Sequence, residues 1–337
     1  MSYQFKVLIC IILIAHILPR LIAQDIQLLA SGTNTSIRGI SAVDDRVIWV
    51  SGSNGLVGKS VDSGKTFNWV TVKGFEKTDF RDIEAFDESS AIIMGIAAPA
   101  YILSTSDGGG NWKVTYENKT DGMFLDAMEF WNDGRNGIVV GDPLEGKFFM
   151  AGTSDRGMHW TELPLQNRAA ADSGEGCFAS SGTNIRLLND RRSVFVSGGL
   201  HSNLVIGNSK TSLPVIQGKE STGANSVAVK DNHIFVVVGG DFTTKDSTTK
   251  NCFITTDAGK SWITPVTAPH GYRSCVEWLG EKSWISCGLN GVDYSKDEGN
   301  NWSLISKESF HVCRKAKKGS AVFFAGSNGR IGRLRGF

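Results

Sequence analysis

A short turn motif that recurs along the 337-residue chain constrains its fold more than any other feature. The motif reads Ser/Thr-x-Asp-x-Gly-x-x-aromatic, and its five copies occupy residues 60–67, 105–112, 153–160, 255–262 and 295–302. An Asp in a tight turn can accept hydrogen bonds from backbone N–H groups one or two residues on, and the Gly can adopt the positive φ that closes the loop. Each copy therefore predicts a hairpin whose aromatic residue anchors the outgoing strand. Because every position has a structural role, the five Asp residues are poor catalytic candidates.

A second marker is a strand that is rich in β-branched and aromatic residues and ends in glycine. Seven such strands end at Gly52, Gly95, Gly141, Gly198, Gly239, Gly288 and Gly326. Their spacing varies between 38 residues, from Gly288 to Gly326, and 57 residues, from Gly141 to Gly198, about the length of four short strands with their turns. We therefore predict an all-β fold, a seven-bladed β-propeller of four-stranded antiparallel blades.

Two repeats lack the turn motif. Residues 204–211 take its place in the fourth repeat without the Asp or the aromatic residue, and the seventh repeat ends before the motif begins. The last repeat then needs a fourth strand from elsewhere in the chain. The strand-like segment 25–30 is left over at the start, so we predict that it pairs with the last repeat and closes the ring.

The N-terminus has the pattern of a secretory signal. Lys6 precedes an apolar run over residues 7–18, and Ala23 offers a small residue before a cleavage ahead of Gln24. We predict a signal peptide over residues 1–23, a single propeller domain over 24–337, and a secreted or periplasmic protein that is a monomer. An uncleaved anchor is the alternative. The run is too short to span a bilayer, and we expect no membrane span in the mature chain.

In an oxidising compartment the cysteines allow two interpretations. Five lie beyond the signal, at Cys177, Cys252, Cys275, Cys287 and Cys313. They could form two disulfides with one free thiol, or serve as buried small hydrophobic residues. No Cys-x-x-Cys pair or His cluster occurs, so we expect no metal site. The sequons at Asn34, Asn118 and Asn301 predict surface glycans in a eukaryotic source.

Charge argues against a nucleic-acid partner. The formal net charge is +1, and the only basic run is the short segment 314–318, which we interpret as a solvated turn. No Gly-x-Gly-x-x-Gly that opens a helix and no flavin signature is present, so we expect no cofactor.

Candidate binding residues come from the predicted inner strands. Fourteen or fifteen places before the signature glycines, six repeats carry a polar or charged residue: Arg38, Arg81, Asp126, Asn225, Arg273 and His311. Equivalent positions in a ring converge on its axis, so three arginines would suit a carboxylate or an acidic or C-terminal peptide. The alternative is that these side chains pair with one another and with water in a wet channel.

A rim site beside the third repeat adds further candidates. Asp142, Glu145 and Lys147 follow the third signature glycine, and a polar insertion over residues 166–177 comes soon after them. Long loops inserted into a rigid scaffold often bind a partner. A tolerated surface insertion is the alternative.

The seven glycine-ended strands and the turn motifs resemble the Asp-box (BNR-type) propellers. Residues 140–147, 153–160 and 178–185 are similar to the non-photosynthetic branch of the photosystem II stability and assembly factor family. Photosynthetic members are thought to hold an unassembled membrane subunit through a basic patch. The resemblance implies a non-catalytic binding or assembly scaffold that recognises a protein or peptide at the channel mouth.

Asp-box propellers also include glycoside hydrolases, so a sialidase-like or xyloglucanase-like enzyme is the alternative function. Such an enzyme requires two carboxylates that face one cleft. A sialidase also requires an arginine triad and a tyrosine nucleophile, for which Tyr272 is the candidate. No Phe/Tyr-Arg-Ile-Pro segment follows the signal, which counts against a sialidase.

Overall fold

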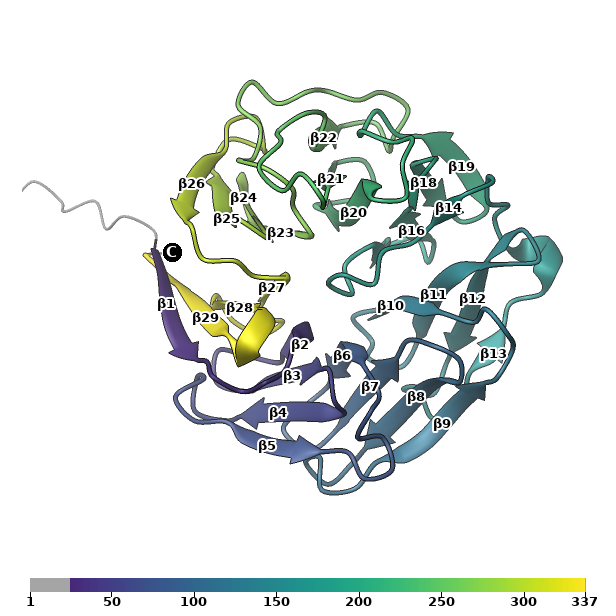
Figure 1. Ribbon diagram of the computed structural model, residues 1–337, viewed down its shortest axis with the longest axis vertical. Helices are drawn as coiled ribbons and strands as arrows, with labels where there is room; N and C mark the ends of the chain where they lie inside the picture. Colours follow the sequence, from purple (N-terminus) through teal and green to yellow (C-terminus); the bar gives the residue numbers. More distant parts are fainter. Residues whose placement is uncertain (1–24, 337) are drawn as a thin grey trace, which may run out of the picture.

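The computed structural model describes residues 25–336 as a ring of seven antiparallel sheets, which confirms the predicted propeller (Figure 1). The predicted signal peptide and its cleavage site lie outside the described residues. Among those residues, no helix is long and apolar enough to cross a membrane. The short helical segments η1 (Leu165–Asn167) and η2 (Ser327–Gly329) are single 3₁₀ turns.

The first three blades are regular four-stranded sheets. Blade 1 contains β2 (Ile37–Ala42), β3 (Ile48–Gly52), β4 (Leu56–Ser60) and β5 (Asn68–Thr71). Blade 2 contains β6 (Phe80–Ala85), β7 (Ala91–Gly95), β8 (Ala100–Thr105) and β9 (Lys113–Asn118). Blade 3 contains β10 (Leu125–Phe130), β11 (Gly137–Leu144), β12 (Lys147–Thr153) and β13 (Thr161–Glu162).

The other blades include the one departure from four strands. Blade 4 contains β15 (Ile185–Leu187), β16 (Ser193–Val196), β18 (Asn203–Ile206) and β19 (Ser209–Ser212). Blade 5 contains β20 (Thr222–Val229), β21 (Phe235–Asp241) and β22 (Cys252–Thr255), extended by β14 (Glu175–Gly176) and β17 (Gly198–Gly199). Its outer strand is reduced to one bridge between Ile254 and Ile263. Blade 6 contains β23 (Cys275–Gly280), β24 (Ser283–Gly288), β25 (Gly291–Ser295) and β26 (Ser303–Ser306).

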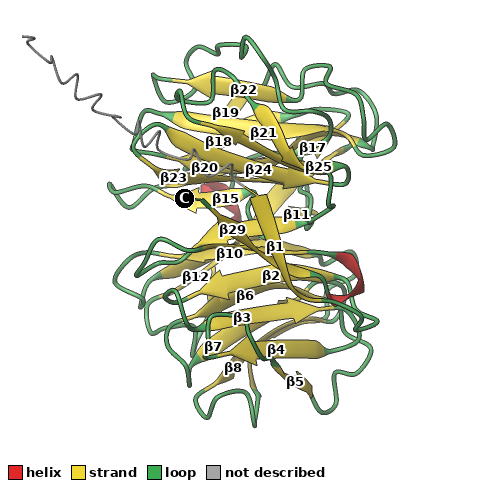
Figure 2. Cartoon of the chain, turned by 90° about the vertical axis from the view of Figure 1, so that its left-hand side faces the viewer, coloured by secondary structure: helices red, strands yellow, loops and turns green. Residues whose placement is uncertain are grey.

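Blade 7 is assembled from both ends of the described chain. It contains β27 (Val312–Lys315), β28 (Val322–Ala325), β29 (Ile331–Arg335) and the N-terminal β1 (Asp25–Ala30), which lies along β29 (Figure 2). Asp25 pairs with Arg335 in this ladder, and the Arg335 Nε donates to Asp25 Oδ1 at 2.9 Å. The predicted closing strand is therefore confirmed. Because β1 pairs with β29, β29 is not left as an unpaired edge strand.

The signature glycines are required because neighbouring backbone lies too close for a side chain. A Cβ on Gly141 would lie 2.3 Å from the Phe124 carbonyl oxygen, and one on Gly288 would lie 2.1 Å from the Tyr272 oxygen. In both blades the close neighbour is the segment that leads into the inner strand. The glycine thus lets the start of the inner strand pack tightly against the second strand.

The five turn motifs share one hydrogen-bond pattern. In the copy at residues 105–112, the Gly109 N–H donates to Thr105 Oγ1 at 3.1 Å, and the Asn111 N–H donates to Asp107 Oδ1 at 3.0 Å. The amide that the Asp accepts is four residues on, not one or two as predicted. Gly109 has φ of 93°, so the positive φ is confirmed. Hydrogen bonds, first from the Asn111 side chain, lower the pKa of Asp107 to about 2.

Packing between blades supplies the core. Each described cysteine is a buried free thiol, which agrees with the interpretation of these residues as small hydrophobic side chains.

At the sequons, Asn34 is exposed, whereas Asn118 and Asn301 donate their amide N–H groups to Glu162 and Asp297. A glycan on either of the last two would remove that hydrogen bond.

Candidate functional site

A β-bulge at the start of the inner strand positions the candidate residues. In blades 1, 2, 3 and 5 the ladder between the first two strands shifts by one residue, at Arg38, Arg81, Asp126 and Asn225. A bulge leaves one residue unpaired and turns its side chain away from the regular alternation. The structure therefore confirms that these four positions are equivalent around the ring.

The sixth blade breaks this equivalence by one residue. Cys275 pairs with Cys287, the residue before the signature Gly288, so the residue equivalent to Arg38 is Ser274 and not Arg273. The Arg273 side chain is fully buried, and its Nε donates to Asp293 Oδ2 at 2.6 Å inside blade 6. Only two of the three predicted arginines therefore reach the axis. Ser274 lies fourteen places before Gly288, the same spacing as Arg38 before Gly52, whereas Arg273 lies fifteen places before it, and sequence counting alone did not distinguish the two spacings.

The channel is not open, because a loop crosses it. Residues 178–182, here called the plug segment, join the insertion to β15 and reach toward the axis from blade 4 (Figure 1). The Ser180 carbonyl accepts from Arg38 Nη1 at 3.2 Å, and the Gly182 carbonyl accepts from Arg314 Nη2 at 3.2 Å. The Ser181 hydroxyl donates to the Ser274 carbonyl at 2.8 Å. The plug segment thus bonds blades 1, 6 and 7 and forms the floor of a pocket.

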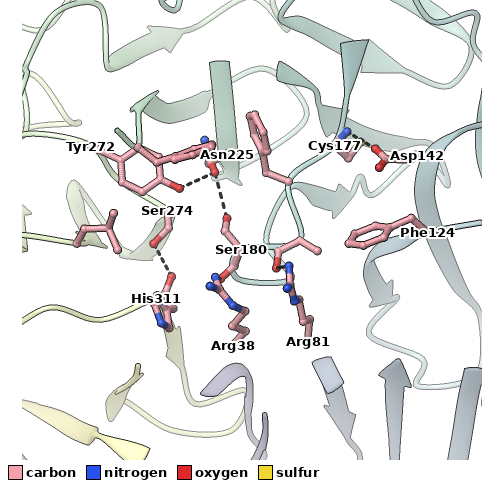
Figure 3. Close-up of a pocket in the computed structure, with 14 residues that line it drawn as sticks. Arg38, Arg81, Phe124, Asp142, Cys177, Ser180, Asn225, Tyr272, Ser274 and His311 are labelled. Atoms are coloured by element: carbon pink, nitrogen blue, oxygen red, sulfur yellow. Dashed lines mark hydrogen bonds between the residues drawn. The ribbon is translucent and has the colours of Figure 1, made fainter. Parts of the chain in front are cut away.

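This pocket opens at the face where the inner strands begin, and its volume is about 380 Å³. Figure 3 shows the side chains that converge on it. Four candidates from the sequence line it together with aromatic and small residues: Arg38, Arg81, Asn225 and His311, with Phe124, Cys177, Phe178, Ala179, Ser180, Phe242, Tyr272, Ser274 and Leu289. Asp142 from the predicted rim also lines it. The turn motifs follow the third strands and so lie at the opposite face.

Two arginines from adjacent blades give the pocket its positive charge. Arg81 is paired with Asp79 at 2.8 Å, whereas Arg38 has no acidic partner within residues 25–336 and donates only to the plug segment. Burial, and then the neighbouring Arg81 cation, holds the pKa of the Arg38 guanidinium below its usual value. A desolvated cation without a counterion is a favourable place for an anionic ligand.

The aromatic wall is a ladder of edge-to-face rings. Phe178 and Phe242 have centroids 6.1 Å apart at 89°, and Phe242 and Tyr272 have centroids 6.4 Å apart at 80°. Phe242 keeps 42% of its surface exposed, which is unusual for so large an apolar side chain. The Tyr272 hydroxyl donates to Asn225 Oδ1 at 2.7 Å, which fixes both side chains at the pocket wall.

Burial shifts the pKa values of the remaining titratable groups, His311, Asp126 and Asp142, in the direction that favours their neutral forms. Burial, followed by the arginines Arg38 and Arg81, lowers the pKa of His311 to about 3, so its ring is neutral. Asp126 sits at the bulge position but is fully buried and does not line the pocket. Burial first, and the nearby Asp142 carboxylate second, raise the pKa of Asp126 well above its ordinary value. Asp126 therefore lies beneath the site, where burial favours the protonated form of its carboxyl group.

The other two rim candidates, Glu145 and Lys147, do not line the pocket, and Lys147 contacts the insertion. Glu145 is an exposed residue with φ of 54° at the tip of the β11–β12 hairpin, and Lys147 Nζ donates to the Arg168 carbonyl at 3.2 Å. At the far end of the insertion, the Cys177 N–H donates to Asp142 Oδ1 at 2.8 Å. The insertion thus orients the plug segment, and Asp142 is the rim residue that faces the pocket.

An ion-pair network fills the channel on the other side of the plug segment. Arg314 bonds Glu129 at 3.2 Å and lies 3.6 Å from Glu277, while Arg186 bonds Glu277 at 3.0 Å. Arg314 was expected in a solvated turn, but it belongs to β27 and only 16% of its side chain is exposed. Burial acts to lower the pKa of Arg314, but the nearby carboxylates of Glu129 and Glu277 outweigh it and hold that pKa above its usual value. Side chains alternate in direction along the inner strand, and this alternation points Arg314 inward. The basic composition of residues 314–318 does not determine that direction.

Sequence reasoning missed most of the pocket wall. Phe124 precedes an inner strand, Phe178 begins the plug segment, and Phe242 follows β21, so all three belong to connections between strands. Such residues have no strand periodicity that would mark them. An aromatic residue directly beside an inner strand is a signal that could have identified Phe124, whereas Phe178 and Phe242 do not adjoin an inner strand.

Solved structures of other proteins match most of the chain. YCF48 from Cyanidioschyzon merolae matches with a TM-score of 0.65 at 15% identity, covering 92% of this chain and 98% of that chain. A structure of YCF48 bound to D1 peptide matches with a TM-score of 0.64 at 13% identity, covering 92% and 96%. The Neurospora crassa Pan2 WD40 domain matches with a TM-score of 0.60 at 14% identity, covering 89% of each chain.

Structural likeness at such low sequence identity establishes the fold of the chain and not its function. The resemblance to the assembly-factor propellers is confirmed at that level, because the chain matches YCF48, a photosystem II assembly factor, over nearly all of its length. No protein-family model and no curated protein matches the sequence.

Proposed function

We propose that this propeller is a binding or assembly module that recognises a carboxylate-bearing segment of a protein or peptide partner at the channel-mouth pocket. The observation that carries this proposal is Arg38, a desolvated guanidinium with no acidic partner among the described residues, placed beside a second arginine. A carboxylate would supply the missing counterion. Two guanidinium groups from neighbouring blades offer enough N–H donors to hold both of its oxygens.

The size and walls of the pocket favour a peptide end over a large surface. A volume of about 380 Å³ holds one or two residues, and the edge-to-face ladder around Phe242 offers an apolar surface for a side chain. The YCF48 structure with a D1 peptide supports a peptide partner, since a protein of similar fold binds a peptide in that structure. Asp142 at the opposite wall favours a ligand with a nearby amide or cationic donor.

The glycoside hydrolase alternative lacks its required geometry at this pocket. Asp142 is the single carboxylate among the described residues that line it, and Asp126 lies buried beneath. Tyr272 is present, but Arg273 is committed to Asp293, so the three arginines do not assemble. No second carboxylate is therefore available to share one cleft.

Binding of peptides with matched ends tests the proposal. We expect short peptides with a free C-terminal carboxylate to bind, and the same peptides with a C-terminal amide to bind about 10- to 100-fold more weakly, since charge-assisted hydrogen bonds contribute about 1.5–3 kcal/mol. The variant Arg38→Ala/Arg81→Ala should lose a similar factor in isothermal titration. Arg46→Ala, which removes an exposed arginine from the turn after β2, is the matched control. Equal binding of acid and amide peptides would refute the proposal.

We also propose that the chain is exported and acts as a monomer. The signal-like pattern before Gln24 supports export. The ring is closed by its own N-terminal strand, which supports a monomer. N-terminal sequencing of the protein from its native source tests export, and an N-terminus that still includes Lys6 would contradict cleavage. Light scattering tests the monomer.

A further inference from the structure

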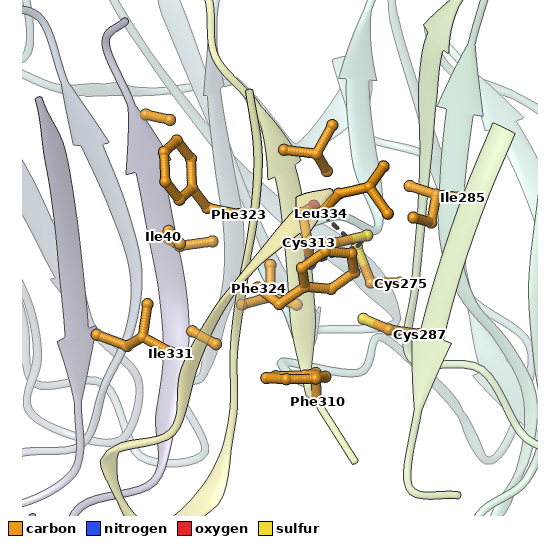
Figure 4. Close-up of a cluster of buried hydrophobic side chains, with 14 of the residues drawn as sticks. Ile40, Cys275, Ile285, Cys287, Phe310, Cys313, Phe323, Phe324, Ile331 and Leu334 are labelled. Carbon is orange, nitrogen blue, oxygen red and sulfur yellow. Dashed lines mark hydrogen bonds between the residues drawn. The ribbon is translucent and has the colours of Figure 1, made fainter. Parts of the chain in front are cut away.

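Three cysteines from two blades meet in the core. Cys275 on β23 and Cys287 on β24 pair across blade 6, and Cys313 lies on β27 of blade 7. The Cys275 and Cys313 sulfurs are 3.6 Å apart, and all three sulfurs lie within 4.8 Å of one another. Figure 4 shows the three side chains together among aromatic and aliphatic neighbours. No motif spacing in the sequence indicates this cluster, because its third member, Cys313, lies on a different blade from the paired Cys275 and Cys287.

The surroundings of the three thiols are apolar. Each cysteine is fully buried, and the side chains packed in the same cluster include Phe310, Phe324 and Ile285. Within residues 25–336 no His, Asp or Glu joins the three sulfurs as a fourth donor. The site thus offers three soft ligands, and its burial among apolar side chains disfavours a complex with a large net charge.

These two properties decide which ion would fit. Zn²⁺ in structural sites takes four ligands, and the fourth is missing. Cu⁺ accepts three thiolates, but the complex would carry two negative charges into the apolar core. A trivalent thiophilic ion forms a neutral complex with three thiolates and leaves no further position to fill. We propose that Cys275, Cys287 and Cys313 form a binding site for such an ion, with As(III) as its representative.

The binding reaction balances without a redox step. Arsenous acid, As(OH)₃, exchanges its three hydroxyl groups for three sulfurs, forming three As–S bonds while each thiol proton leaves with a hydroxyl as water. Both As(OH)₃ and the product are neutral, so no charge crosses the core at any stage. Because the sulfurs are fully buried, uptake requires local opening between blades 6 and 7 and is expected to be slow.

Occupancy would join two blades that otherwise pack without a covalent link. Cys313 belongs to the blade that β1 closes, so the ion would tie blade 6 to the closing blade of the ring. A ligand that binds only the folded state raises the melting temperature with its concentration. Arsenite should therefore raise the melting temperature of the wild-type protein and not that of a variant lacking one of the three thiols.

Intact-mass spectrometry with X-ray absorption tests the site. The reduced full-length protein, incubated with arsenite, should gain one arsenic and lose three hydrogens, and its spectrum should show three sulfur neighbours. Cys313→Ala should abolish this three-sulfur species, whereas Cys252→Ala, which removes a buried thiol on β22, should leave it unchanged. Should Cys313→Ala fail to fold, the wild-type stoichiometry and the sulfur count still decide.

Three outcomes would overturn the inference. The first is the absence of arsenic in the wild-type protein after prolonged incubation. The second is an unchanged three-sulfur species in Cys313→Ala. The third is a disulfide between Cys275 and Cys313 in protein purified without reductant that persists in the presence of thiols, since the site would then not be available. None of these outcomes bears on the channel-mouth pocket, which contains none of the three cysteines.

Discussion

Removing the buried guanidinium of Arg273 tests whether this arginine stabilises the core, whereas the other two predicted arginines, Arg38 and Arg81, line the pocket. Arg273 and Asp293 have no exposed side-chain surface, and the Arg273 Nη1 also donates to the Tyr272 carbonyl at 2.8 Å. Asp293 Oδ1 in turn bonds His270 Nδ1 at 2.6 Å. Arg273→Ala would leave the Asp293 carboxylate buried with only the His270 contact. Breaking a buried pair in this way costs about 3–5 kcal/mol of unfolding free energy.

An exposed pair of the same chemistry provides the control. Arg335 and Asp25 form the same type of contact with 56% and 48% of their side chains exposed, so Arg335→Ala should cost less than about 1 kcal/mol. The double variant Arg273→Leu/Asp293→Leu removes both charges and should recover part of the loss, because no unpaired charge remains. Urea denaturation at constant pH measures all of these values.

The same variants separate stability from binding. Arg273→Lys keeps a charge but lacks the planar fork that meets Asp293, Tyr272 and Asn290, so we expect an intermediate loss of stability. Its affinity for carboxylate peptides should match that of the wild-type protein, because Arg273 does not line the pocket. A cost for Arg273→Ala below about 1 kcal/mol, or a loss of peptide binding in folded Arg273→Lys, would refute this placement of the side chain.

Three further predictions address the frame of the ring. Gly141→Ala should cost about 1–3 kcal/mol in urea denaturation, because its Cβ would meet backbone at 2.3 Å, while Gly152→Ala, with its nearest atom at 3.7 Å, should be close to neutral. Equal effects would contradict the steric reason for the signature glycines. Burial raises the pKa of Asp82 to about 8, so the folded state keeps a proton that the unfolded state loses above about pH 4. Its stabilising contribution should be complete at low pH and fall by at most roughly 1.4 kcal/mol per unit as pH rises towards 8, and Asp82→Asn should remove this fall from the stability profile. Parallel profiles would show that Asp82 is ionised. Deletion of residues 25–30 should lower the melting temperature and cause self-association in size-exclusion chromatography, because β29 becomes an open edge. A monomeric deletion variant of unchanged stability would contradict ring closure by β1.

The sequence by itself determined the architecture. The glycine-ended strands recur once per blade and the turn motif recurs in five of the seven blades, so the number of blades, the hairpin turns and the leftover strand 25–30 followed from counting. This works because each blade repeats the same local constraints. Gly141 and Gly288 must be glycine for the same steric reason, and Asp107 makes hydrogen bonds within its own turn.

The tertiary structure alone decided the chemistry at the centre. Successive side chains of a strand face opposite ways, so an error of one residue in the register exchanges core and pocket positions: Arg273 lies in the core and Ser274 lines the pocket. The plug segment finds its place only through contacts with distant blades, such as the bond from Arg38 to Ser180. Cys275 and Cys313 likewise meet only because two blades pack together. Contacts between blades join residues far apart in the chain, and no local pattern in the sequence records them.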